Sequence, residues 1–396
     1  MLTTQADICR QALDALLARQ RALDFNWFSI NSTPSTPTIG FIRRHLPLGG
    51  VMVRQFYRLL PFNARGKFVA GEQPDNPKSL LLFLIGLLEI DDDQARSDRL
   101  RLEKRLLALR SSKARNFAIR QNKRLDLLSY GADADDISPL LTMLAGRYFL
   151  RAWQHTGDGG CADLARCVIR YFLEEHPRKE FGPDGVYFYY EPHSPLVIYN
   201  ASAQISAFLL AGGSALDLPE AVAAGKRGMD FVISRQNPDG SWHYGESKWC
   251  RYIDNFHTAM LLDALATASA YSAEAASSFA SGLAFYRRTL VPGGRPRHFA
   301  WRRPPLNSSL FLRLDLRDLL LTATVFLLHS ERMPELADDA GRLLAKAVKS
   351  MFRKDRFYPE ITWLWKNRIP YVEFQAWGVA ALAMYIHHTD TGAVND

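Results

Sequence analysis

The sequence has few of the features that mark a secreted or membrane-spanning chain. Its four cysteines include no Cys-x-x-Cys pair and are too sparse for a disulfide scaffold. The longest apolar run, Leu80 to Leu88, is too short to cross a bilayer. The first 20 residues mix charges into an amphipathic pattern and lack the apolar core of a signal peptide. We therefore expect a cytoplasmic protein whose cysteines are reduced. Peripheral association with a membrane surface is compatible with this expectation.

Several chemistries also lack their sequence signatures. No Gly-rich phosphate loop and no His-Glu-x-x-His zinc helix is present, and the ten histidines show no metal-ligand spacing. No nucleic-acid-binding module is recognisable either. We therefore expect no metal, no cofactor and no nucleic-acid partner. The formal net charge of +8 favours another anionic partner, such as an acidic sugar, a diphosphate or lipid headgroups.

What the sequence does contain is a repeat of about 60 residues. Each repeat opens with a helix-start signal, and in five of the six an Asn or Asp at the N-cap can accept hydrogen bonds from the first backbone N–H groups. An apolar helix rich in Ala and Leu then follows. The six signals are Asn76-Pro77, Asp136, Asn200, Asp254, Asp315 and Tyr371.

A second, more charged helix of amphipathic period follows each of the first five apolar helices. These helices are expected near 92–113, 159–176, 219–236, 273–290 and 334–351. The apolar helices should lie inside and the amphipathic ones outside. The sixth apolar helix has no such partner after it, and an N-terminal helix of about residues 5–23 could take that place.

This alternation predicts an all-α fold, an (α/α)6 toroid of six helical hairpins, in which residues 1–396 form a single domain. Residues 1–23 would close the ring. Residues 24–75 look like an irregular excursion that could act as a lid or a plug.

Aromatic-rich linkers precede four of the inner helices. They are too long and too aromatic for bare turns, so we expect short β-hairpins in them. Because all four lead to N-termini of inner helices, they should meet at one mouth of the ring and wall a cleft. The four linkers are residues 186–200, 240–254, 297–315 and 356–374.

The middle third of the chain carries a family resemblance. Tyr199-Asn200, residues 236–245 (QNPDGSWHYG) and residues 253–258 (IDNFHT) resemble the VpsJ-like exopolysaccharide-biosynthesis proteins. Weaker echoes are Asn76-Pro77-Lys78 and the stretch from Tyr371 to Trp377. The resemblance implies a six-hairpin, glycosidase-like toroid and a place in surface or secreted polysaccharide assembly.

A second resemblance is to the squalene-type triterpene cyclases. Residues 227–242 (RGMDFVISRQNPDGSW) fit their Gln-Trp repeat, and Asp133-Ala134-Asp135-Asp136 is similar to their Asp-x-Asp-Asp acid motif. This resemblance implies that Asp135, beside Asp136, protonates an alkene and that the substrate is a prenyl diphosphate. The sequence departs from the pattern at Ile137-Ser138, where the family has Thr-Ala, and it has only one Gln-Trp repeat.

Asp254 and His257 are the leading candidates for catalysis. On a helix that begins near Asp254, His257 lies one turn on and on the same face. Asp254 could then act as general acid or base with His257 as its partner. Hydrolysis needs a second carboxylate. Glu373, at another inner-helix start, is a better candidate for it than Asp315 or Asp318. The alternative is that Asp254 only caps the helix and that His257 is a satisfied core residue.

Residues around the same mouth could hold a sugar. Aromatic rings suit the C–H faces of sugars, although at least one of the three aromatic candidates in linker 240–254 should be purely structural. Tyr190 and Asn200 would, together with His257, suit β-elimination of a uronate. Arg302 could bind a carboxylate or a diphosphate through its planar fork. The remaining candidates for substrate contact are Trp242, Tyr244, Trp249, Asn255 and Trp377.

We therefore predict a carbohydrate-active protein of exopolysaccharide or glycan biosynthesis, which cleaves or epimerises an acidic oligosaccharide or polysaccharide. Hydrolysis, elimination and epimerisation stay open. One alternative is a class II terpene-type cyclase, and another is a non-catalytic glycan-binding scaffold. A cyclase needs Asp135 in a deep, dry pocket that keeps the acid protonated, whereas a sugar enzyme needs Asp254 at an open, wet groove.

Overall fold

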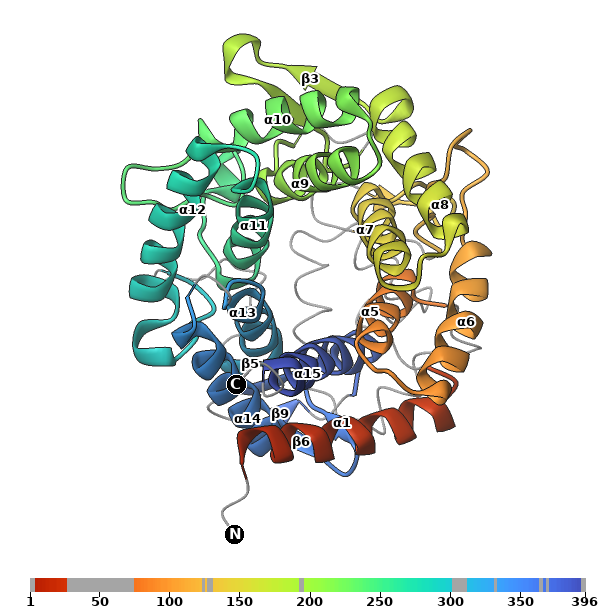
Figure 1. The fold of residues 1–396 in the computed structure, drawn as a ribbon. Coiled ribbons are helices and arrows are strands. Elements are labelled where there is room, and N and C mark those ends of the chain that lie inside the picture. The colour runs from red at the N-terminus through yellow and green to blue at the C-terminus, as the bar shows by residue number, and fades with distance from the viewer. Residues whose placement is uncertain are drawn as a thin grey trace, which may run out of the picture.

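The chain folds into a closed ring of two concentric helical layers (Figure 1). The computed structural model describes residues 4–26, 75–122, 125–126, 131–191, 196–300, 312–330, 333–362, 366–367 and 370–392. The inner layer consists of α5 (Pro77–Leu88), α7 (Pro139–Thr156), α9 (Tyr199–Ala215), α11 (Asn255–Ala268), α13 (Leu316–Leu328) and α15 (Val372–Gly392). The outer layer consists of α1 (Gln5–Ala22), α6 (Asp93–Leu107), α8 (Gly159–Arg170), α10 (Pro219–Ile233), α12 (Ala273–Phe285) and α14 (Glu335–Met351). The predicted (α/α)6 toroid is confirmed.

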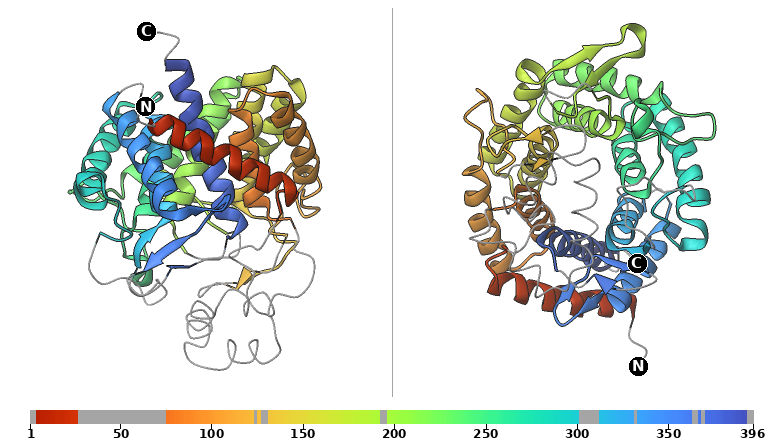
Figure 2. Two further views of the ribbon diagram at one scale, coloured as in Figure 1. Left: turned by 90° about the horizontal axis from the view of Figure 1, so that it is seen from below. Right: turned by 180° about the vertical axis from the view of Figure 1, so that it is seen from behind.

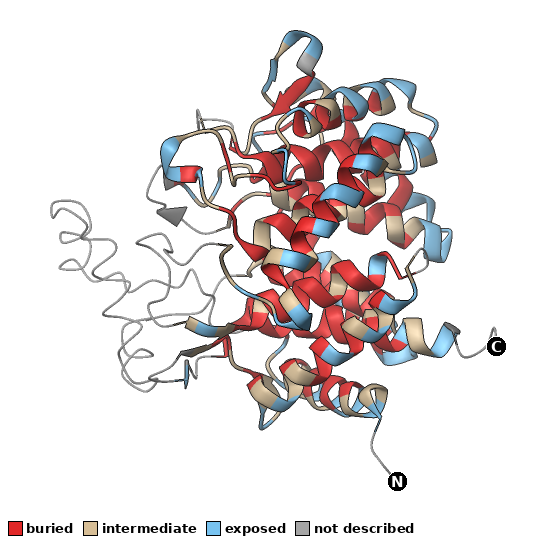
Figure 3. Ribbon diagram, turned by 90° about the vertical axis from the view of Figure 1, so that its left-hand side faces the viewer, coloured by how far each residue is buried: buried red, intermediate tan, exposed pale blue. Residues whose placement is uncertain are grey.

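Burial separates the two layers in the way that the hydrophobic pattern predicts. Almost every residue of α9 from Tyr199 to Gly213 is buried, because α7, α10 and α11 pack around this helix. The outer helix α14 instead buries a stripe that includes Leu336, Leu343 and Leu344 and turns charged residues outward. Figure 3 shows this division around the ring, with buried ribbon inside and exposed ribbon at the periphery.

Short side chains cap three of the inner helices. The side chains of Asn76, Asp254 and Asp315 each accept a hydrogen bond from a backbone N–H in the first turn of α5, α11 and α13. The expected start at Asp136 is displaced: α7 begins at Pro139, since proline suits the first helical position. Asp136 instead accepts a hydrogen bond from the backbone of Asp133.

Some outer helices end earlier than the pattern predicts. Helix α6 stops at Leu107 rather than near residue 113, because the chain turns back there and Arg110 pairs with Ile119 in an antiparallel bridge. Helices α8 and α12 each continue into a π-helical turn, η1 (Tyr171–Glu175) and η4 (Tyr286–Leu290).

The linkers carry short strands. A three-stranded antiparallel sheet has the order β5 (Leu312–Asp315), β8 (Glu360–Thr362), β9 (Lys366–Asn367). Hairpins pair β1 (Leu125–Asp126) with β2 (Gly131–Ala132), β3 (Arg178–Glu180) with β4 (Val186–Phe188), and β6 (Phe352–Arg353) with β7 (Arg356–Phe357). Figure 2 shows β5, β8 and β9 at the end of the ring opposite the C-terminus, where inner helices begin. The linkers thus gather polar and aromatic residues at one mouth.

Helix α1 lies against α14 and α15, between the last and the first hairpins of the ring (Figure 1). Its Leu16 is fully buried in the core. Residues 27–74, which hold most of the expected excursion, lie outside the described residues, so a lid there stays a prediction. In the part of the chain that the structure describes, no helix is both long and apolar enough to span a membrane.

Candidate functional site

Asp254 is held at the first turn of α11 by two hydrogen bonds from His257. Its Oδ1 accepts from the backbone N–H of His257, and its Oδ2 accepts from the imidazole Nδ1, both at 2.7 Å. Burial alone would raise the pKa of Asp254, but His257 and the nearby His298 lower it below its usual value. The carboxylate therefore stays charged at neutral pH, caps the helix and orients the imidazole.

A second histidine–carboxylate pair lies beside the first. His298 Nδ1 lies 2.8 Å from Asp318 Oδ2 on α13. The backbone brings the two pairs together, because residues 298–300 run along residues 253–255. Asp254 and Phe299 form an antiparallel bridge, and the N–H of Asn255 donates to the carbonyl of His298 at 3.0 Å.

The second pair retains a proton near neutral pH. Burial would lower the pKa of His298, but the charge of Asp318 and its hydrogen bond raise it to about 9. The pKa of Asp318 is itself raised, by burial and by the neighbouring charge of Asp315, against the lowering effect of His298. The pKa of Asp315 shifts in the other direction from that of Asp318. Burial would raise it, but the charge and the two hydrogen bonds of Arg317 lower it below its usual value.

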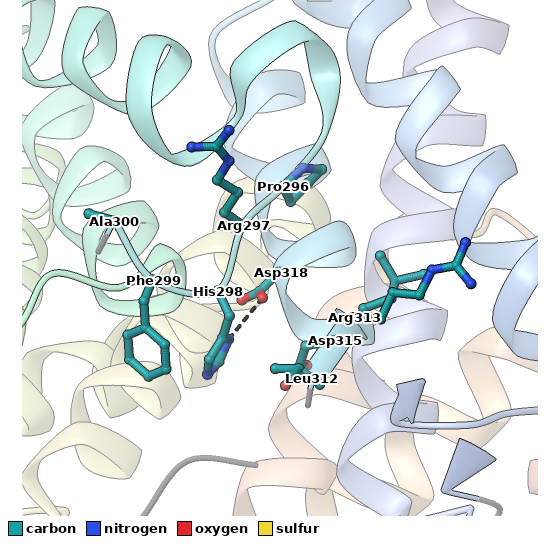
Figure 4. Close-up of a pocket in the computed structure, with 10 residues that line it drawn as sticks. Pro296, Arg297, His298, Phe299, Ala300, Leu312, Arg313, Asp315 and Asp318 are labelled. Atoms are coloured by element: carbon teal, nitrogen blue, oxygen red, sulfur yellow. Dashed lines mark hydrogen bonds and ion pairs between the residues drawn. The ribbon is translucent and has the colours of Figure 1, made fainter. Parts of the chain in front are cut away.

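A cavity of about 370 Å³ opens at this second pair. It is lined by residues 296–300, by strand β5 and by Asp318, and Figure 4 shows the His298–Asp318 contact at its centre. Asp318 Oδ1 is buried and has no hydrogen-bond partner among the described residues. Such an acceptor is costly to leave unpaired, which disfavours the charged carboxylate and agrees with the raised pKa of Asp318. The exposed Arg297 and Arg313 line the same cavity and add positive charge.

Aromatic rings enclose the imidazole of His257. Its ring centroid is 4.2 Å from that of Tyr244 and 5.1 Å from that of Phe256. Tyr244 also stacks on Tyr252 at 5.1 Å. Since Nδ1 is used by Asp254, Nε2 is the nitrogen left for a substrate.

Side chains from four inner helices meet near the axis of the ring. Lys78 Nζ of α5 lies 5.5 Å from the ring centroid of Phe256, although α5 and α11 face each other across the ring in Figure 1. Trp377 of α15 and Arg317 of α13 approach the same ring, with centroid distances of 6.4 Å and 5.7 Å. We call Lys78, Phe256, Arg317 and Trp377 the axial layer.

Glu373 lies at the first turn of α15, beside this axial layer. It is buried and its Oε1 accepts a hydrogen bond from the Asn76 amide at 2.9 Å. Burial lowers the pKa of Lys78, and the negative charge of Glu373 opposes that shift. The structure thus brings Glu373 and Trp377, both sequence candidates, to the same layer as Phe256.

Two expected sugar contacts are core residues instead. Trp242 is 1% exposed and its indole N–H donates to the carbonyl of Val232. Its ring cannot present a face to a sugar, which corrects that expectation. Asn255 is fully buried and its Oδ1 accepts hydrogen bonds from Tyr286 and Thr322, so its carbonyl oxygen is used in helix packing.

The other sequence candidates are dispersed. Trp249 is 90% exposed on a short 3-10 turn, η3 (Lys248–Cys250). Tyr190 is half-buried and, like Tyr244, packs against a small cluster at the start of α9 that includes Ile198. Asn200 is buried, and its amide lies 3.7 Å from the sulfur of Met260. Arg302 lies outside the described residues.

The acidic motif that resembles the cyclases does not lie in a dry pocket. The Asp135 side chain is 70% exposed and pairs with Arg120 at 3.2 Å. Asp136 pairs with Lys113 at 2.7 Å. A cyclase acid needs desolvation to remain protonated, so the expected cyclase site is corrected: these aspartates are surface ion-pair partners.

Two of the comparisons with known proteins found nothing: no protein-family model matches the chain, and no curated protein matches its sequence. The resemblances to VpsJ-like proteins and to triterpene cyclases are therefore not confirmed.

Solved structures do match the chain. It is similar to a family 76 glycoside hydrolase (mannosidase) from Bacteroides thetaiotaomicron, with 10% identity and a TM-score of 0.63 over 98% of this chain and 99% of that one. A cellobiose 2-epimerase from Spirochaeta thermophila matches with 12% identity and a TM-score of 0.57, over 80% and 87%. An unsaturated glucuronyl hydrolase specific for heparin matches with 13% identity and a TM-score of 0.55, over 78% and 85%. At these identities the likeness shows the fold.

Proposed function

We propose that the chain is a carbohydrate-active enzyme that transfers protons on an acidic oligosaccharide or polysaccharide. The observation that carries the proposal is the pair of imidazoles at one mouth, each held at Nδ1 by a buried aspartate. A carboxylate on one nitrogen fixes the ring and directs the other toward a substrate. The solved structures of similar fold include enzymes named as glycoside hydrolases and an epimerase, which supports a carbohydrate substrate.

The two pairs suit different steps of one reaction. His257, oriented by charged Asp254, would act through Nε2 as the base that removes a proton from a sugar carbon next to a carboxylate or carbonyl group. His298 is protonated at neutral pH because Asp318 stabilises its charge, so it would donate a proton. Return of a proton to the opposite face of the same carbon gives epimerisation. Donation to the glycosidic oxygen, with cleavage of that bond and formation of a carbon–carbon double bond, gives elimination.

The same geometry makes Asp254 a positioning residue and not the acid itself. A glycosidase acid must be protonated before it reaches the glycosidic oxygen. Asp254 has a lowered pKa and both its oxygens accept hydrogen bonds from His257. We therefore assign the proton transfer to His257 and the orientation to Asp254, which reverses the roles expected from the sequence.

The charges around the cavity support an acidic substrate. Arg297, Arg313 and protonated His298 line it, and the chain as a whole carries +8. A role in exopolysaccharide or glycan biosynthesis and a cytoplasmic location belong to the proposal as well, on the strength of the sequence resemblance of residues 199–258.

Deuterium uptake is the deciding experiment. The purified chain is incubated in D₂O with oligouronates and with neutral oligosaccharides, and the products are followed by NMR and mass spectrometry. Epimerisation places deuterium on the inverted carbon, and elimination produces an unsaturated uronate. Either product, absent with His257→Asn, supports the proposal. New reducing ends without carbon-bound deuterium or unsaturation would indicate hydrolysis and contradict it, as would turnover that His257→Asn leaves intact.

A further inference from the structure

The axial layer contains an ammonium group that is enclosed but not paired. Lys78 Nζ lies 5.5 Å from the centroid of Phe256 and 5.7 Å from that of Trp377. Within the part of the chain that the structure describes, this nitrogen makes no hydrogen bond or ion pair, and the rings of Phe256 and Trp377 support its charge. Aromatic faces attract a cation but replace only part of the hydration that a compact ammonium loses.

The other charges in and beside the axial layer are already engaged. Arg317 grips Asp315 through Nε and a terminal nitrogen, at 3.2 Å and 2.9 Å. Glu373 accepts the amide hydrogen bond of Asn76. The pKa of Lys78 is lowered to about 8, mainly by burial and also by the charge of Arg317, whereas the charge of Glu373 opposes the shift. The enclosed ammonium is therefore the charge in this layer that an anion would stabilise most.

We propose that Lys78, Phe256 and Trp377 form a subsite for a uronate residue, in which the ammonium pairs with the sugar carboxylate and the indole face lies against the pyranose ring. The inference deepens the proposed function and rests on it in taking a carbohydrate as the ligand. The position fits, because Phe256 immediately precedes His257 and the two rings meet edge to face at 5.1 Å. A sugar held on the axial layer would thus lie next to the imidazole that is assigned as the base.

The subsite has its own pH dependence. Lys78 carries its charge below about pH 8 and loses it above, so preference for an acidic sugar should fall between pH 7 and pH 9. His298 loses its proton near pH 9 as well. Arg317, whose pKa is raised, and Asp315, whose pKa is lowered, keep their charges over this range, so Lys78 and His298 are the groups to separate.

Calorimetry with matched ligands tests the subsite directly. Oligogalacturonate and oligomannuronate are titrated into the full chain at pH 7 and compared with their methyl esters, which keep the shape but lose the charge. The inactive variant His257→Asn is used so that no ligand is consumed. We expect the acid to bind roughly tenfold or more tightly than its ester, since a charge-assisted contact is lost in the ester.

Lys78→Met should abolish the preference and Lys78→Arg should retain it. Lys104→Met, on the exposed face of α6, is the matched control and should leave it unchanged.

The outcomes are distinct. A preference that survives in Lys78→Met, or no acid that binds more tightly than its ester, overturns the subsite. If Lys78→Met does not fold, the pH series in a His298→Gln chain decides, since an unchanged preference from pH 7 to pH 9 contradicts the role of Lys78. Preference for acids without deuterium uptake would contradict only the proton-transfer chemistry. Deuterium uptake on neutral sugars with no acid preference would contradict the subsite and the acidic substrate, but not the proton-transfer chemistry.

Discussion

Asp254 makes two contacts that one substitution can separate. Its Oδ1 caps α11 and its Oδ2 orients His257. Asparagine is as good an N-cap as aspartate, because its side-chain carbonyl accepts the same backbone hydrogen bond. It cannot, however, supply the negative charge that holds an imidazole. The capping and the positioning roles therefore predict different effects of Asp254→Asn.

We expect Asp254→Asn to lower turnover by about 10³-fold while it changes the free energy of unfolding by less than about 1 kcal/mol. The measurements are steady-state kinetics and denaturant unfolding. Asp92→Asn, at the N-cap of the outer helix α6, is the matched control, because it tests the same cap chemistry away from the mouth. If both variants keep full activity, Asp254 serves only as a cap.

His298 gives a prediction for stability against pH. Its pKa is raised in the folded chain to about 9, from an ordinary value of 6.5. The proton is bound more tightly in the folded state, so the stabilisation is complete below pH 6.5 and disappears as the pH rises through 9. We expect the midpoint of thermal unfolding to fall by a few degrees over this window and the fall to be smaller in His298→Gln. Lys78 has the opposite effect on the free energy of unfolding. Its pKa is lowered to about 8 in the folded chain, so its effect is to raise stability as the pH rises above 8. Equal slopes in the two chains would show that His298 is not paired with Asp318.

The two pairs also show how far sequence reasoning reaches at this scale. The pairing of Asp254 with His257 follows from a spacing of three residues on a helix. His298 and Asp318 are 20 residues apart across a linker, and they lie beside the first pair because residues 298–300 run along residues 253–255. No local pattern signals such a contact. The burial of Trp242 is unpredictable for the same reason, since its pocket against Val232 is made by tertiary packing.

At the scale of elements, the helices were predictable because capping and hydrophobic period are local properties. The helices from Pro219 to Ile233 and from Asn255 to Ala268 begin where proline and aspartate predict. Helix ends depend more on contacts: α6 stops at Leu107 because its continuation pairs with residues near Ile119. Close approach between layers also depends on small residues whose need for space the sequence does not reveal.

Gly225 on α10 is such a residue. A Cβ there would lie 2.8 Å from the backbone nitrogen of Leu210 and 2.8 Å from the carbonyl oxygen of Ser206, both on α9. Backbone atoms cannot move aside as a side chain can, so Gly225→Ala should cost about 1–3 kcal/mol or more. Gly159→Ala, at the start of α8, meets nothing within 4 Å and should cost nothing or stabilise slightly. Urea unfolding of the two variants compares them, and equal stability would mean that α9 and α10 are less closely packed than described.

At the scale of the whole molecule, a ring differs from an open stack of hairpins because it has no end repeats to cap. Helix α1 comes from the N-terminus but packs against α14 and α15 near the C-terminus. Arg10 pairs with Asp390 across this contact at 2.7 Å, but both side chains are about half exposed, so the pair adds little. The apolar face of α1, with Leu16 and Leu17, must supply most of the closure.

Leu16→Asp tests whether α1 holds the ring closed. Leu16 is fully buried, and a Cβ on Gly378 of α15 would lie 3.2 Å from its Cδ2, so the two helices touch there. A carboxylate at this position would be unpaired and desolvated, and we expect a loss of at least about 3 kcal/mol. Ala18→Asp, on the exposed side of the same helix, is the matched control and should change stability by less than about 0.5 kcal/mol.

If closure is essential, Leu16→Asp should also increase the hydrodynamic radius and weaken oligouronate binding, because α15 carries Trp377 and Glu373 into the mouth. A chain that keeps its radius and its ligand affinity despite Leu16→Asp would show that the other five hairpins hold the mouth without α1.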